Sequence, residues 1–106
     1  MALDASLAAL ADPTRRRLLR LVGERPRKAG ELAEVFPVSR PAVSKHLRVL
    51  REAGLIEAEA QGRARIYRLA PGGITEVRRW LEETGTLWDS ALEAFRRHAE
   101  GEEVTE

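Results

Sequence analysis

The segment that decides the fold reads VSRPAVSKHLRVLREAG and covers residues 38–54. A serine such as Ser39 is a favourable N-cap and a glycine such as Gly54 favours a helix end, so we expect a helix over about 40–53. Val43, Leu47 and Leu50 recur at helical spacing and would face the core. The opposite face carries small and basic residues: Arg40, Pro41, Ser44, Lys45 and Arg48.

A shorter helix is expected just before this one, over about 29–36, with Pro37 as its stop. The tight turn between the two helices holds one aliphatic residue, Val38, which we expect to be buried. Two helices joined in this way form a helix-turn-helix unit, whose second helix enters the major groove of DNA with its N-terminus first. The outward residues of 40–53 are therefore candidates for contacts with bases and phosphates. For any single one of them, an ordinary solvated side chain is the alternative.

Two further helices are expected upstream. The first covers about 2–11, where Leu3, Leu7 and Leu10 recur at helical spacing. The second covers about 13–22, because Asp12 is a good N-cap, proline is tolerated in a first turn, and Gly23 favours an end. Residues 24–28 are polar and contain a proline, so we expect a loop there.

The pattern changes to a period of two over residues 55–69. Two alternating runs flank a turn at Gln61-Gly62, which predicts a β-hairpin, the wing of a winged helix. Its tip carries Arg63 and Arg65 on one outward face, where they are candidates for contacts with the DNA backbone or a narrow minor groove. The alternative is an edge strand that its charges protect from aggregation.

A long amphipathic helix is expected over about 74–98, or two helices broken at Gly85. Its apolar stripe is wider than a small domain needs, so we expect it to join the first helix in a two-fold interface between two copies of the chain. The predicted dimerisation residues are Leu3, Leu7, Leu10, Trp80, Leu81, Trp88, Leu92 and Phe95. The predicted fold is mainly α with a small β-hairpin: a single winged helix-turn-helix domain over 1–106, dimeric through its first and last helices.

Composition narrows the class of protein. The 106 residues are 43% hydrophobic and 33% charged, which favours a packed core over disorder. Residues 1–70 carry a formal charge of +6 and residues 71–106 carry −5, which suits a surface that meets phosphate at one end. There is no cysteine for disulfides or metal ligands, no apolar run of membrane-spanning length and no basic signal segment, so we expect a cytoplasmic protein.

No spacing typical of a catalytic triad or a phosphate-binding loop is present, so we expect neither an enzyme nor a cofactor. A winged helix that docks a protein partner is one alternative function. It would call for an apolar outward face on residues 40–51, where this chain has a basic one. A repressor gated by a metal or a small ligand is the second alternative.

Three segments resemble a known family: LADPTRRRLL at 10–19, GELA at 30–33 and VSRPAVSKHLRVLREAGLI at 38–56. They resemble the ArsR/SmtB family of bacterial winged-helix repressors, and the likeness runs from about Leu7 to Leu69. The resemblance implies a homodimeric transcriptional repressor. It also implies binding to a double-stranded, inverted-repeat operator near a promoter.

By position, the resemblance implies base contacts by Pro41, Ser44 and Lys45. His46 also matches a common family residue, which would touch phosphate or pack at the helix edge. Many members sense metals, but this chain lacks their cysteine pair, and the Asp-x-His pair of the last helix finds Asp89 with an alanine at position 91. The chain therefore resembles the branch that does not sense metals, and its inducer stays unidentified.

Overall fold

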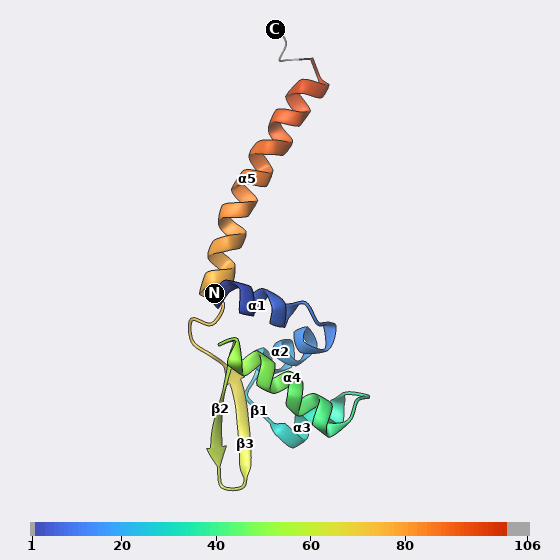
Figure 1. Cartoon of the computed structure of the whole chain (residues 1–106), viewed down its shortest axis with the longest axis vertical. Helices are drawn as coiled ribbons and strands as arrows, with labels where there is room; N and C mark the ends of the chain where they lie inside the picture. The colour runs from blue at the N-terminus through green and yellow to red at the C-terminus, as the bar shows by residue number, and fades with distance from the viewer. Residues whose placement is uncertain (1, 102–106) are drawn as a thin grey trace. The chain divides into compact units, whose positions relative to one another are not determined.

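The computed structural model describes residues 2–101 (Figure 1). The described elements are α1 (Ala2–Leu10), α2 (Pro13–Glu24), β1 (Arg27–Lys28), α3 (Ala29–Val35), α4 (Arg40–Glu52), β2 (Ile56–Gln61), β3 (Ala64–Leu69) and α5 (Thr75–Ala99). The chain divides into two compact units at residues 76 and 77, within the first turn of α5. No described helix is long and apolar enough to cross a membrane.

The core of the first unit is built around α4. Val43, Leu47 and Leu50 are buried, as their spacing predicts. They belong to one cluster with buried residues from other parts of the first unit: Ala9, Leu18, Val22, Leu32, Phe36, Leu55, Ile56 and Tyr67. Burial of each large aliphatic side chain contributes about 1.5–3 kcal/mol. This packing fixes which face of α4 turns inward, and so fixes which face is left to solvent.

The fully buried residues of α1 are small. Ser6 and Ala9 are buried, whereas Leu3, Leu7 and Leu10 are half-buried. Small side chains let a helix backbone approach the core closely. Part of the apolar surface of each leucine therefore stays open to a further contact.

The sheet has three strands instead of the two expected. The prediction of a loop over 24–28 is wrong, because Arg27 pairs with Tyr67 and Lys28 pairs with Ile66. A strand of two residues is too short to show alternation, and α2 also runs past Gly23 to Glu24. The strand order is β1-β3-β2, and both pairings are antiparallel.

The hairpin turn consists of Gly62 and Arg63, between the paired residues Gln61 and Ala64. Gly62 has a φ of 60°, and no described residue other than glycine has a positive φ. A glycine at the first of two central positions is typical of a type II′ turn, whose twist matches that of the strands. This turn places Arg63 at the tip of the wing, the hairpin formed by β2 and β3.

One residue expected in the core is at the surface. Val38 is 39% exposed, so the prediction that it is buried in the turn before α4 is wrong. Phe36 is buried instead, and the guanidinium of Arg17 lies 4.8 Å from the centre of its ring. The aromatic residue at the end of α3, and not the valine of the turn, therefore belongs to the core cluster.

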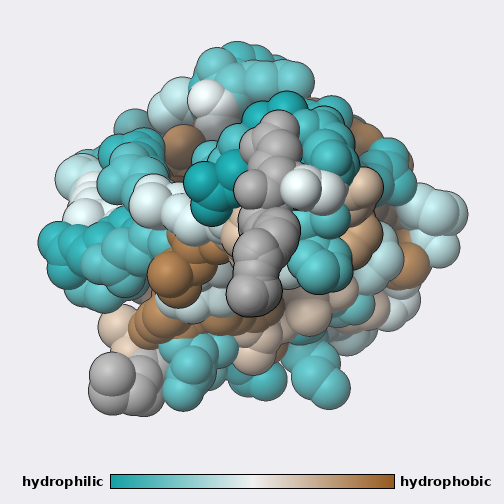
Figure 2. Space-filling view, turned by 90° about the horizontal axis from the view of Figure 1, so that it is seen from above, coloured by the Kyte–Doolittle hydropathy of each residue, from teal (hydrophilic) through white to brown (hydrophobic). Residues whose placement is uncertain are grey.

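The last helix, α5, is continuous through Gly85, although a glycine inside a helix costs about 1 kcal/mol relative to alanine. Val77 is the one buried residue among those described in α5. The other large apolar side chains of the helix are exposed: Trp80, Leu81, Leu87, Trp88, Leu92 and Phe95. These six residues are called the α5 stripe. Figure 2 shows apolar side chains (brown) at the surface among hydrophilic ones (teal).

Gly73 lets the chain leave the wing past the end of α4. A Cβ atom at this position would lie 2.5 Å from the carbonyl oxygen of Gly54 and 3.2 Å from Cα of Leu55. Backbone atoms cannot rotate away, so we expect Gly73→Ala to lower the free energy of unfolding by about 1–3 kcal/mol.

Gly85→Ala is the matched control, because, apart from its chain neighbours and the nearby backbone of its own helix, no atom lies within 4 Å of its Cβ position. It should raise the free energy of unfolding by up to about 1 kcal/mol through helix propensity. Thermal unfolding followed by circular dichroism measures both variants. Equal midpoints for the two would contradict the close approach at Gly73.

Candidate nucleic-acid interface

The N-terminal end of α4 is fixed by its cap. Ser39 Oγ accepts a hydrogen bond of 3.2 Å from the backbone N–H of Ala42, and Pro41 occupies the first turn, where its missing N–H would have no helical partner. All five predicted outward residues of the helix are exposed: Arg40, Pro41, Ser44, Lys45 and Arg48. The described part of the chain therefore leaves this face open.

One edge of the exposed face borders α3. Arg40 and Ser44 line a small cavity of about 90 Å³ between the two helices. The residues of α3 on its other wall are all small: Ala29, Gly30 and Ala33. Lys45 and Arg48 do not line this cavity. The small side chains of α3 therefore leave Arg40 and Ser44 accessible along this edge of α4.

His46 lies apart from these residues, at the junction of α1 and α2. Its Nδ1 atom is 3.3 Å from Nη1 of Arg15 and 4.0 Å from Oδ2 of Asp12, and its side chain is 21% exposed. Arg15 also donates hydrogen bonds to the carbonyl oxygens of Ala9 (2.7 Å) and Ala8 (3.2 Å) at the end of α1. His46 therefore packs at the edge of α4, which is one of the two roles that the sequence left open, and contact with phosphate is the other.

Asp12 completes this junction as the N-cap of α2. Its Oδ2 atom accepts a hydrogen bond of 3.0 Å from the backbone N–H of Arg15. That hydrogen bond is the main reason why the pKa of Asp12 is lowered, with smaller contributions from the charges of His46 and Arg15. The same hydrogen bond fixes the start of α2, and Oδ2 of Asp12 lies 4.0 Å from Nδ1 of His46 on α4.

The wing and β1 bring three cations to one hollow. A cavity of about 550 Å³ is lined by Lys28, Arg63 and Arg65, together with the start of α3. None of the three side chains forms an ion pair with a described residue. The sequence pattern indicates Arg63 and Arg65 but not Lys28, because only the pairing of Lys28 with Ile66 brings it beside the wing. These three residues are called the wing cations below.

Two carboxylates, Glu31 and Glu34, line the same hollow. Glu31 accepts hydrogen bonds from Arg25, Arg27 and the backbone N–H of Lys28. The hydrogen bond from Arg25 is the main reason why the pKa of Glu31 is lowered. Because two other arginines offset the charge of Glu31, the balance of charge in the hollow favours an anion.

Arg68 does not belong to the wing cations. Its Nε donates to Glu57 at 2.9 Å and its Nη1 donates to Glu59 at 2.8 Å, and both acceptors lie on β2. These two hydrogen bonds raise the pKa of Arg68, and the one that it donates to Glu57 has the larger effect. Arg68 therefore joins the two strands of the wing to each other.

Known proteins with similar sequences are helix-turn-helix regulators. A sequence profile of a helix-turn-helix domain matches residues 10–59. The HTH-type transcriptional regulator Rv2034 of Mycobacterium tuberculosis is 39% identical over 99 residues, which cover 93% of this chain and 90% of the relative. The transcriptional repressor SdpR of Bacillus subtilis is 34% identical over 69% of this chain and 81% of the relative.

The fold has a solved counterpart. An ArsR-like transcriptional regulator from Rhodococcus sp. RHA1 matches with a TM-score of 0.74 and 38% identity over 92% of each chain. The order of helices and the hairpin confirm the prediction of a mainly α winged helix-turn-helix fold. By its sequence and its fold, this chain belongs to the ArsR/SmtB family of winged helix-turn-helix transcriptional regulators.

Proposed function

We propose that this chain binds double-stranded DNA with sequence preference and represses transcription as a homodimer on an inverted-repeat operator. The observation that carries the proposal is the open face of small and basic side chains on α4, with the wing cations on the same unit. In a winged helix-turn-helix protein the recognition helix reads base edges, and contacts with phosphates set its register.

We assign base reading to the first two turns of α4. Arg40 and Lys45 carry N–H donors that suit O6 and N7 of guanine, and the hydroxyl of Ser44 both donates and accepts. Pro41 is compact and lets the backbone approach the base edges. His46 was also predicted to contact DNA, and its contact with Arg15 favours a role in positioning α4.

We assign phosphate contacts to the residues that flank this face. Arg48 lies one turn further along α4, and the wing supplies Arg63 and Arg65. Lys28 joins them through β1. Contacts of this kind add affinity and set register without reading sequence.

We propose that two copies associate through α1 and α5. The α5 stripe offers six exposed large apolar side chains, and Leu3, Leu7 and Leu10 keep open apolar surface. Contiguous exposed apolar surface is typical of an interface, and an isologous two-fold contact would cover both copies of it. In such a dimer the two α4 helices would reach half-sites about 34–36 Å apart, which is one turn of DNA.

We favour a regulator that does not sense metals. The sequence has no cysteine and two histidines, His46 and His98, and the described residues contain no group of three His, Asp or Glu that could hold a metal ion. Zinc sites use three or four such ligands. Metal analysis of the purified protein tests this, and a stoichiometric metal would contradict it.

A band-shift titration tests DNA binding directly. The probe is DNA from upstream of the gene that encodes this chain, and the competitor is random DNA of equal length at moderate salt. We expect a preference of about 10³-fold or more for a specific site. No preference over random DNA would contradict the proposal, and a preference would supply the operator for the experiments below.

Lys45→Ala should reduce discrimination between operator and random DNA by about 5- to 100-fold, because a bidentate base contact is worth about 1–3 kcal/mol. Ser44→Ala should act in the same direction with a smaller effect. Arg51→Ala is the control, since it removes an exposed charge from the last turn of the same helix. Unchanged discrimination in Lys45→Ala would mean that α4 does not read the bases.

A further inference from the structure

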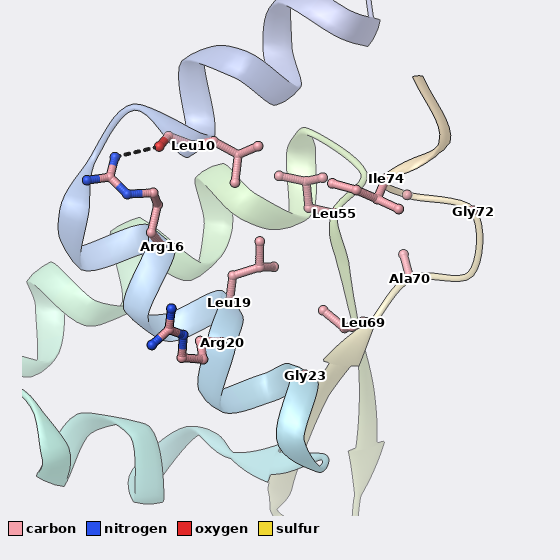
Figure 3. Close-up of a pocket in the computed structure, with 11 residues that line it drawn as sticks. Leu10, Arg16, Leu19, Arg20, Gly23, Leu55, Leu69, Ala70, Gly72 and Ile74 are labelled. Atoms are coloured by element: carbon pink, nitrogen blue, oxygen red, sulfur yellow. Dashed lines mark hydrogen bonds between the residues drawn. The ribbon is translucent and has the colours of Figure 1, made fainter. Parts of the chain in front are cut away.

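A mostly apolar hollow lies within the first unit, between α2 and the end of β3 (Figure 3). It has a volume of about 510 Å³ and is enclosed by α1, α2, the end of β3 and residues 70–74. Its apolar walls are formed chiefly by Leu10, Leu19, Leu55, Leu69 and Ile74. Leu69 and Ile74 remain 46% and 37% exposed, so the first unit by itself leaves this hollow open.

The lining of the hollow is polarised. In Figure 3, Arg16 and Arg20 lie on one side of Leu10 and Leu19, and Ile74 lies on the other side. No Asp or Glu is among the lining residues. A molecule seated there would therefore have an apolar part against the leucines and an acceptor or anion at the α2 edge.

The two arginines differ in how far they are already engaged. Nη1 of Arg16 donates to the carbonyl oxygens of Leu10 (2.8 Å) and Ala11 (3.1 Å), so this guanidinium also closes the end of α1. Arg20 is exposed and forms no side-chain hydrogen bond or ion pair with a described residue. Arg20 is thus the cation at this edge that has its donors free.

We propose that this hollow binds a small amphipathic carboxylate, with an apolar chain over Leu19 and Leu69 and a carboxylate that reaches Arg20. Small-molecule sites typically have volumes of about 300–1,000 Å³ and a mostly apolar lining with a few polar groups. Guanidinium groups bind carboxylates through two parallel hydrogen bonds. Charge complementarity and the single polar edge together select this ligand class.

The position of the hollow also gives the ligand a route to the DNA-reading elements. It touches α2, which packs against α4, and the end of β3, which forms the wing. A bound carboxylate would therefore change the affinity for the operator. This regulatory part rests on the proposed function, whereas ligand binding itself does not.

Dodecanoate, kept below its micelle concentration, is the probe for binding to the full chain. Isothermal titration should show saturable binding of one molecule per chain, with dodecanol and acetate both weaker because each lacks one half of the match. Arg20→Gln should weaken dodecanoate binding by about ten- to a hundredfold and leave dodecanol unchanged. Arg17→Gln is the matched control, because Arg17 is on the same helix but does not line the hollow.

Two results would overturn the proposal. One is the absence of saturable dodecanoate binding, and the other is equal binding by wild type and Arg20→Gln. If dodecanoate does not bind and Leu69→Glu shifts the balance between monomer and dimer, a second copy of the chain covers the hollow instead. Since these measurements need no DNA, they can disprove ligand binding whatever the result of the band-shift test. A dodecanoate that binds without changing operator affinity would remove only the regulatory part.

Discussion

Replacing the three wing cations together, as Lys28→Ala/Arg63→Ala/Arg65→Ala, is expected to weaken DNA binding by about 10²–10³-fold near 0.1 M salt. Each phosphate contact releases condensed counterions, which adds about 0.9 to the slope of log K against log salt concentration. The loss of three contacts should therefore make that slope shallower by about 2.7. Operator and random DNA should be affected alike, because phosphate contacts carry no sequence information.

The control for this triple variant removes the same formal charge from another part of the chain. Arg78, Arg96 and Arg97 are exposed on α5, and their replacement by alanine should leave the slope within about 0.5 of the wild-type value. Arg68→Ala is a second control within the wing, where Glu57 and Glu59 already engage the side chain. A wild-type slope in the wing variant would show that the wing does not lie on the DNA backbone.

Lys28→Ala alone tests the contribution that the sequence did not reveal. It should account for about one third of the change in slope, since all three cations line one hollow. If Arg63→Ala and Arg65→Ala together reproduce the full effect, Lys28 lies beside the wing without touching phosphate.

The parts of the fold that the sequence predicts correctly are those governed by local signals. Ser39 and Asp12 both act as N-caps through hydrogen bonds three residues along the chain, and both helices begin where these caps place them. The spacing of Val43, Leu47 and Leu50 fixes the inward face of α4, and therefore its outward face as well. Most of the candidate interface follows from these few residues.

The parts that the sequence does not predict depend on contacts between distant segments. Lys28 joins the wing only because β1 pairs with β3, some forty residues further along the chain. His46 has the periodicity of a flank residue on α4, but its contact with Arg15 comes from the junction of α1 and α2. Phe36 is buried and Val38 is exposed, and the local pattern does not say which of these two apolar residues joins the core.

The α5 stripe is a feature whose apolar face the sequence predicts but whose partner it does not identify. An apolar face at helical spacing predicts that the face is buried, but it does not identify the surface that covers it. Here the large apolar side chains of α5 remain exposed in the described chain. The leucines of α1 are also partly exposed, because the buried face of that helix is formed by Ser6 and Ala9. A second copy is the partner whose presence both observations would explain.

Trp88→Glu/Leu92→Glu is expected to convert the chain from a dimer into a folded monomer. The two side chains are 67% and 53% exposed, so the substitutions remove little from the core of the described chain. In a dimer they would bury carboxylates in an apolar contact, where an unpaired charge is strongly unfavourable. Light scattering coupled to size exclusion measures the mass, and circular dichroism checks that the helices persist.

The loss of the dimer should also appear in DNA binding. Two linked recognition helices bind two half-sites with an avidity about 10²–10⁴-fold above that of one, so the monomer should bind the full operator about as weakly as a single half-site. Thr86→Glu/Ser90→Glu is the matched control, since it places two carboxylates at the same spacing on the polar face of α5. That control should remain a dimer with wild-type affinity for the operator. If the Trp88→Glu/Leu92→Glu variant remained a dimer, the α5 stripe would not form the interface. Two carboxylates buried in a close apolar contact would cause that contact to dissociate.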